Sequence, residues 1–121
     1  MKLECTQDNL DKALSHISRA VSTRTTLPIT QNVLLKAVEG KLQLSATNLE
    51  MALNTWIGAS IAQEGETTIP ARLLTDLIRT FPNQNIKLES DNENNTINIK
   101  CGPYDSNLIT QPTEDFPLIP Q

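Results

Sequence analysis

Aromatic residues are scarce in this sequence: one Trp, one Tyr and two Phe occur among 121 residues. A hydrophobic core must therefore be built mainly from Leu, Ile, Val and Ala, which suits small and regular layers of secondary structure. The chain has the length of one domain and can bury such a core without disulfides or metals. The sequence does not predict a second domain within these residues.

Cysteine, glycine and long apolar runs are also in short supply. Cys5 and Cys101 are the two cysteines, and their spacing matches no metal-ligand pattern, so we expect reduced thiols. Only four glycines occur, and they form no glycine-rich phosphate loop. No apolar run approaches the roughly 20 residues of a membrane span, and the N-terminus does not resemble a signal peptide. These absences predict a soluble, cytoplasmic protein with no cofactor, no metal and no membrane partner.

Groups suited to catalysis are few. His16 is the single histidine, and its place among basic residues of a predicted helix favours a surface role over that of a general base. Glu50, Glu64 and Glu66 form no acid pair with a recognisable motif. The sequence therefore favours a protein that is not an enzyme, and an unrecognised hydrolase using Cys5 or His16 is the alternative.

Two segments have the periodicity of amphipathic helices. In 8–21 the apolar residues recur at three- and four-residue spacing and form one stripe, and Thr6 or Asp8 is placed to cap its start. The segment 70–81 opens on a proline, which the first turn of a helix tolerates, and stops before Pro82. The spacing predicts one helix in each segment.

Most of the remaining sequence alternates apolar and polar residues, which predicts strands. The predicted strands are 2–6, 32–38, 41–47, 50–61, 66–69, 85–90, 96–101 and 104–110. Glu39 and Gly40 predict a tight hairpin turn, and 91–95 a longer polar one. The order of elements indicates one β-α-β-β-β unit that occurs twice. We therefore predict an α+β fold with two helices packed on one face of antiparallel sheets.

The placement of charge matters more here than its total. The net charge of −4 argues against a polyanionic partner. All the arginines, however, fall on the predicted helices or in the loop after the first one: Arg19, Arg24, Arg72 and Arg79. The segments 8–24 and 70–82 each carry a net charge of +1, whereas the predicted strands contain no arginine.

The basic residues of each predicted helix share one face. Lys12 and Arg19 are two helical turns apart, opposite the apolar stripe, and Arg72 and Arg79 have the same spacing. Charge alone leaves an alternative open, which is an ordinary solvated helix surface with Asp76 paired to Arg72.

Four separated motifs occur in one order: "RTTLPITQNVLL" at 24–35, "SATNLEM" at 45–51, "TTIPARLLTDLI" at 67–78 and "PTEDFP" at 112–117. In their order and spacing they closely resemble the first domain of the bacterial sliding clamps, the beta subunits of DNA polymerase III. The resemblance covers essentially all 121 residues. Several motifs in one order are more specific than any single motif.

The resemblance implies a processivity factor of DNA replication. Clamps of this family are head-to-tail homodimer rings with three similar domains in each chain, and their helices line a hole around duplex DNA. By this resemblance, residues 1–121 would be DNA-clamp domain one, with 112–121 running into an interdomain linker and domains two and three absent. DNA polymerase III subunits and the clamp loader would dock in a cleft of those absent domains. The implied location is the cytoplasm, at the nucleoid.

The resemblance also implies site residues. Arg24, in the loop after the first helix, and Arg72, at the head of the second, match positions that face the phosphate backbone of DNA. Lys12, Arg19 and Arg79 are assigned to the same surface because they lie on the same helix faces. Contact with phosphates alone carries no base-sequence preference.

A second implied site is the boundary between the two chains of the ring. The matching positions are Leu77, Phe81, Tyr104, Ser106 and Leu108, and the strand 104–110 would extend a sheet across the boundary. Ser106 stands where relatives often carry a bulky apolar residue, which implies a weaker or differently packed interface. The alternative function is a small β-rich protein-interaction module without a DNA role.

Overall fold

The fold consists of two helices and nine strands in the part of the chain that the computed structural model describes, residues 1–18, 31–47, 51–111 and 113. The elements are β1 (Lys2–Thr6), α1 (Gln7–Ile17), β2 (Asn32–Val38), β3 (Lys41–Thr47), β4 (Ala52–Gly58), β5 (Ser60–Gln63), β6 (Gly65–Pro70), α2 (Ala71–Thr80), β7 (Asn85–Asp91), β8 (Thr96–Cys101) and β9 (Tyr104–Ile109). The predicted α+β class is confirmed.

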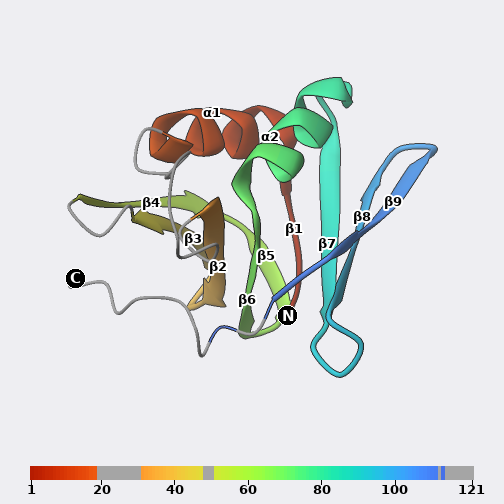
Figure 1. Ribbon diagram of the computed structural model, residues 1–121. Coiled ribbons are helices and arrows are strands. Elements are labelled where there is room, and N and C mark those ends of the chain that lie inside the picture. The colour runs from red at the N-terminus through yellow and green to blue at the C-terminus, as the bar shows by residue number, and fades with distance from the viewer. Residues whose placement is uncertain (19–30, 48–50, 112, 114–121) are drawn as a thin grey trace.

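The strands form two antiparallel sheets, in the orders β5-β1-β7-β8-β9 and β4-β3-β2-β6. The predicted repeat is present, with β5 inserted between its two units. The two units interlock, because β1 of the first unit pairs with β7 of the second, and β6 of the second pairs with β2 of the first. Figure 1 shows α1 and α2 beside each other along one side of both sheets.

Local capping fixes where the first helix begins. The side chain of Thr6 accepts a hydrogen bond from the backbone N–H of Asn9 at 3.3 Å, so Thr6, rather than Asp8, caps α1. Inside the first turn, the buried Gln7 donates from Nε2 to the carbonyl oxygen of Ile78 at 2.9 Å, which ties α1 to α2. Ser18 occupies the C-cap position, and the predicted extension of the helix over 19–21 lies outside the described residues.

The prediction of a single strand over 50–61 is wrong. The chain forms β4 up to Gly58 and then β5 from Ser60, and these two strands belong to different sheets. The backbone N–H of Ala59, between them, donates to the carbonyl oxygen of Gly40 at 3.1 Å. Alternation of apolar and polar residues continues through this corner, so the sequence pattern does not reveal it.

The predicted hairpin at Glu39 and Gly40 is confirmed. Both residues have positive φ, 52° and 75°, and they join β2 to β3. The longer turn at 91–95 is also confirmed. The Asp91 side chain accepts hydrogen bonds from the backbone N–H groups of Glu93 and Asn94, and Asn95 has a φ of 52°. Glycine at position 40 suits the left-handed conformation of the second turn residue.

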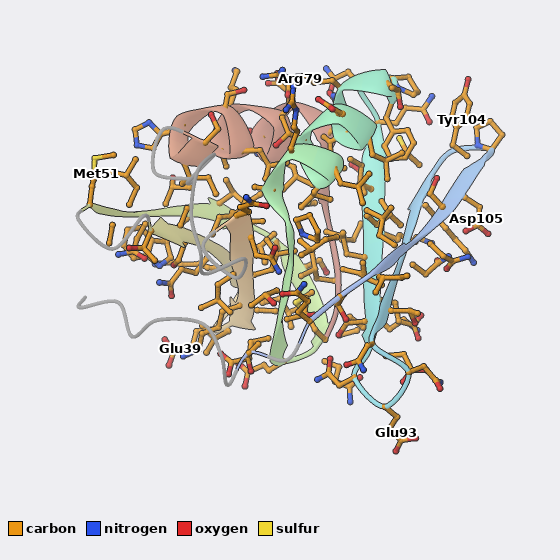
Figure 2. All side chains as sticks on the ribbon, in the orientation of Figure 1. Glu39, Met51, Arg79, Glu93, Tyr104 and Asp105 are labelled. Carbon is orange, nitrogen blue, oxygen red and sulfur yellow. The ribbon has the colours of Figure 1, made fainter. Side chains whose placement is uncertain are left out.

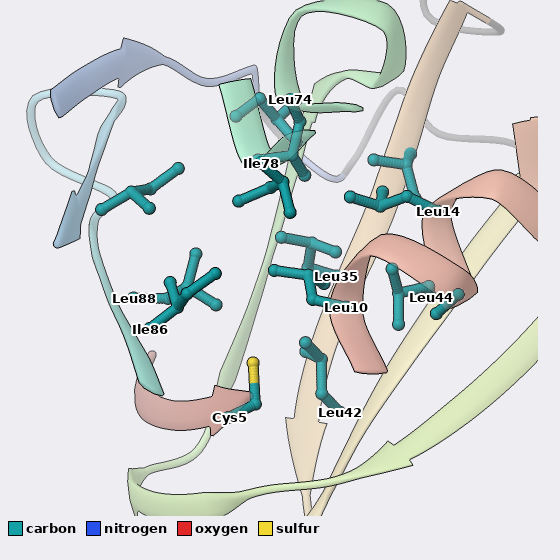
Figure 3. Packing of buried hydrophobic residues seen from close by; sticks show 14 of the residues in the cluster. Cys5, Leu10, Leu14, Leu35, Leu42, Leu44, Leu74, Ile78, Ile86 and Leu88 are labelled. Carbon is teal, nitrogen blue, oxygen red and sulfur yellow. The ribbon is translucent and has the colours of Figure 1, made fainter. Parts of the chain in front are cut away.

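Aliphatic side chains fill the space between the helices and the sheets, as Figure 3 shows. Side chains from both helices and both sheets contact each other there. They include Leu10 and Leu14 from α1, Leu74 and Ile78 from α2, Leu42 and Leu44 from β3, and Ile86 and Leu88 from β7. Two aromatic residues, Trp56 and Tyr104, lie near the margins and are each 53% exposed, whereas Phe81 is 7% exposed and belongs to the core. None of the described helices is long and apolar enough to cross a membrane.

Candidate nucleic-acid interface

The two helices carry the predicted cationic surface. They pack against each other above the sheets, and their outer side is free of strands (Figure 1). Figure 2 shows Arg79 at this outer side, whereas Glu39 and Glu93 lie at the opposite end of the molecule. Of the five predicted phosphate contacts, Lys12, Arg72 and Arg79 can be placed, and Arg19 and Arg24 lie outside the described residues.

Arg79 bridges the two helices. Its Nε lies 3.5 Å from Oδ1 of Asp11, and its guanidinium donates to Oγ of Ser15 at 3.2 Å. Both partners belong to α1, and the Arg79 side chain remains 55% exposed. Arg79 is therefore a link between the helices and also an accessible cation.

Lys12 takes part in a looser ion pair. Its Nζ lies 3.1 Å from Oδ2 of Asp8, one helical turn earlier, and the two side chains are 74% and 51% exposed. An exposed pair of this spacing contributes only about 0.3–0.5 kcal/mol to stability. Lys12 can therefore exchange Asp8 for another anion at little cost.

Arg72 is the one of these three cations that forms no ion pair within the described part of the chain. It is exposed in the first turn of α2, and the ion pair with Asp76 that helical spacing suggested does not form. The ion pairs within the described ranges are Lys12–Asp8 and Arg79–Asp11. The first turn of α2 holds no acidic residue, so its unsatisfied N–H groups add a positive potential beside Arg72.

The groups considered for hydrolysis lack an activated nucleophile. Cys5 is 5% exposed, and burial, with a smaller contribution from Glu4, raises the pKa of its thiol to about 12. Burial also raises the pKa of Cys101, whose Sγ lies 3.6 Å from the carbonyl oxygen of Pro82. His16 is exposed in the last turn of α1. Across residues 1–18, 31–47, 51–111 and 113, no three His, Cys, Asp or Glu side chains gather as a metal site.

The predicted subunit boundary lies at the free edge of the five-stranded sheet. β9 pairs with β8 on one side and has no strand on the other within the described part of the chain. The rings of Phe81 and Tyr104 stack with centroids 6.0 Å apart, which joins the end of α2 to the start of β9 (Figure 2 labels Tyr104). Leu77 and Leu108 are half-buried against the core, and Ser106 lies opposite Ile99 of β8.

Comparison with known proteins decides which family has this arrangement of helices and sheets. Residues 1–120 match the family described as DNA polymerase III beta subunit, N-terminal domain. The chain belongs to this family.

Relatives of this sliding-clamp family cover the whole chain. The beta sliding clamp of Synechococcus elongatus is 36% identical over 99% of this chain, and that of Streptomyces coelicolor is 33% identical over all of it. In each case the chain spans 32% of the relative's length. The solved sliding clamp of Caulobacter crescentus is 34% identical, with a TM-score of 0.93 over all of this chain and 33% of its own. The DNA polymerase III subunit beta of Pseudomonas aeruginosa is 31% identical, with a TM-score of 0.92 over the same shares.

Sequence reasoning missed two features of this clamp-family domain. Asp11 and Ser15 of α1 hold Arg79 of α2, and helical spacing reveals only partners on the same helix. A second polar link joins the last described residues to the four-stranded sheet: Asn32 donates to Oε1 of Gln111, and Thr68 donates to the Gln111 carbonyl oxygen. A β-bridge pairs Thr68 with Gln111 at the same point.

Proposed function

We propose that this chain is one domain of a DNA polymerase processivity factor, a ring-shaped sliding clamp that encircles duplex DNA and tethers the replicative polymerase. The observation that carries the proposal is the match of the whole chain to 33% of the length of the solved Caulobacter crescentus sliding clamp, at a TM-score of 0.93. The proposed role is that of a non-catalytic accessory subunit, in the cytoplasm at the nucleoid.

The helix surface supplies the proposed contact with DNA. Within the described residues Arg72 forms no ion pair, and Lys12 and Arg79 are exposed cations that each pair with a carboxylate of α1. With Arg19 and Arg24, they would neutralise a few phosphates without reading base sequence. A few long cations on an otherwise acidic chain suit a contact that orients DNA and still permits sliding.

The edge at β9 supplies the proposed boundary between two chains. In a head-to-tail homodimer ring, the unpaired side of β9 would continue the sheet of the neighbouring subunit, next to Leu77, Phe81, Tyr104, Ser106 and Leu108. The ring would need two further domains in each chain, with residues 112–121 leading into the second. Polymerase III subunits and the clamp loader would bind in a cleft of those domains.

Duplex binding tests this function against a β-rich protein-interaction module. We expect the chain to bind duplex weakly at about 50 mM salt, without sequence preference, and to lose affinity as salt rises. Replacing both Arg24 and Arg72 by Glu should abolish the binding, as measured by fluorescence anisotropy of labelled duplexes.

A matched control reverses the same charge elsewhere. Lys41 and Lys100 are exposed on strands outside the helix surface, so the variant with both replaced by Glu changes net charge equally. It should retain most of the affinity. A parent chain that does not bind duplex, or equal losses in the two double variants, would contradict the proposed interface.

A further inference from the structure

Asp11 is held in an unusual position between the helices. Its Oδ1 is shielded from solvent and accepts no hydrogen bond from the described residues, although Nε of Arg79 lies 3.5 Å away. Its side chain is 35% exposed as a whole. The positive charge of Arg79 therefore stabilises this buried carboxylate oxygen in place of a hydrogen bond.

This arrangement makes Arg79 costly to remove from Asp11. A carboxylate oxygen out of contact with water and without a donor is destabilising, and the loss of a nearby cation adds to that cost. Ser15 holds the guanidinium at a second point, 3.2 Å away. If Arg79 turned toward a phosphate, both interactions would be lost.

The other ion pair of the surface has no such cost. Asp8 and Lys12 are both more than half exposed, so water replaces the partner when the pair separates. The two acidic residues of α1 therefore differ in effect, because Asp8 leaves Lys12 available and Asp11 retains Arg79.

We propose that Asp11 is a positioning residue that competes with DNA phosphate for Arg79 and so weakens the grip of the helix surface on duplex. The inference rests on the proposed function and adds an internal regulator to the same site. Arg79 stays mainly on α1 when DNA is near, and it contributes little to the number of neutralised phosphates. A contact that must move along DNA benefits from such a restraint.

The test measures duplex affinity as a function of salt by fluorescence anisotropy for the parent, Asp11→Asn and Asp76→Asn. Asp76 is an exposed carboxylate of α2 that forms no ion pair in the described part of the chain, so its substitution controls for the change in net charge. Release of Arg79 adds one neutralised phosphate, so Asp11→Asn should bind about tenfold tighter at about 50 mM salt, with a salt slope steeper by about 0.9. Asp76→Asn should show a smaller gain and an unchanged slope.

Two further variants isolate the role of Arg79. In an Arg79→Gln background, Asp11→Asn should gain no more affinity than Asp76→Asn does. Ser15→Ala leaves all charges in place and frees the second point of attachment, so it should tighten binding about twofold. Ser15 is exposed, and this variant keeps the test valid if Asp11→Asn folds poorly.

The outcomes separate this inference from the proposed function. If the parent binds duplex, but Asp11→Asn matches Asp76→Asn or keeps its gain without Arg79, the competition is wrong and the clamp function stands. If no variant binds duplex at low salt, the proposed function fails and this inference fails with it.

Discussion

Burial decides the chemistry of Cys5. Its thiol lies in the core between β1 and the helices, and Figure 3 shows it among aliphatic side chains. Desolvation disfavours a thiolate there and raises the pKa from 9.0 to about 12. A side chain that the sequence left as a candidate nucleophile is thus a small apolar residue in the folded protein.

The shifted thiol predicts an alkaline loss of stability. The folded state holds the Cys5 proton more tightly than the unfolded chain, so this contribution is fully present below pH 9.0 and is lost as pH rises towards about 12. The free energy of unfolding should fall by up to about 1.4 kcal/mol per pH unit in that window. Cys5→Ala should lack this component. Urea unfolding of both proteins at about pH 8 and about pH 10 measures the difference, and equal losses would contradict the assignment.

The elements follow the sequence closely wherever one local pattern decides them. Strands β2, β3 and β8 have the predicted bounds, and α2 begins one residue after its predicted start because Pro70 serves as its N-cap. The passage of the chain from one sheet to the other at Ala59 and the pairing of β1 with β7 depend on contacts between distant segments. Periodicity carries no information on such contacts. The same limit applied to the site: the helical spacing of the basic residues predicted the helix face on which Arg79 lies, but it did not predict the partners of Arg79 on α1.

One edge of β9 has no neighbouring strand in the described part of the chain, and this edge predicts self-association of the isolated chain. Exposed backbone donors and acceptors beside apolar side chains favour the addition of another strand. Ile109 is 75% exposed on this strand, so Ile109→Lys adds a charge to the edge without removing a core side chain. Leu108→Lys should suppress association too, but Leu108 is half-buried and its loss also weakens the fold.

Sedimentation over a concentration series measures this association. We expect the parent to be monomeric when dilute and to associate when concentrated, and Ile109→Lys to remain monomeric. Ala52→Lys places the same charge on β4, the edge of the other sheet, and should leave the association intact. A parent chain that stays monomeric at every concentration would argue against β9 as the boundary. An equal loss of association in Ala52→Lys and Ile109→Lys would do the same.

In the whole molecule, the two repeat units share both sheets. Each sheet contains a strand from the other unit, because β1 lies between β5 and β7, and β6 closes the sheet of β2 to β4. Cutting the chain between β5 and β6 therefore leaves each half with an incomplete sheet and an uncovered apolar face. We expect peptides 1–64 and 65–121 to be unfolded alone and to regain β structure when mixed.

Circular dichroism with urea unfolding tests this expectation. The mixture should unfold in one cooperative transition, as the intact chain should, because one core serves both units. A cooperative transition in either peptide alone would show that a unit has an independent core.

The exchange of strands between units also affects how fast the fold can form. When the segment up to Gln63 has left the ribosome, β1 has β5 beside it, but β7 begins only at Asn85 and the sheet ends with β9 at Ile109. A large share of the native contacts therefore joins segments far apart in the chain, and such high contact order is typical of domains that fold in milliseconds to seconds. During synthesis, the first strand and first helix therefore lack their full set of neighbours until the segment up to β9 has emerged.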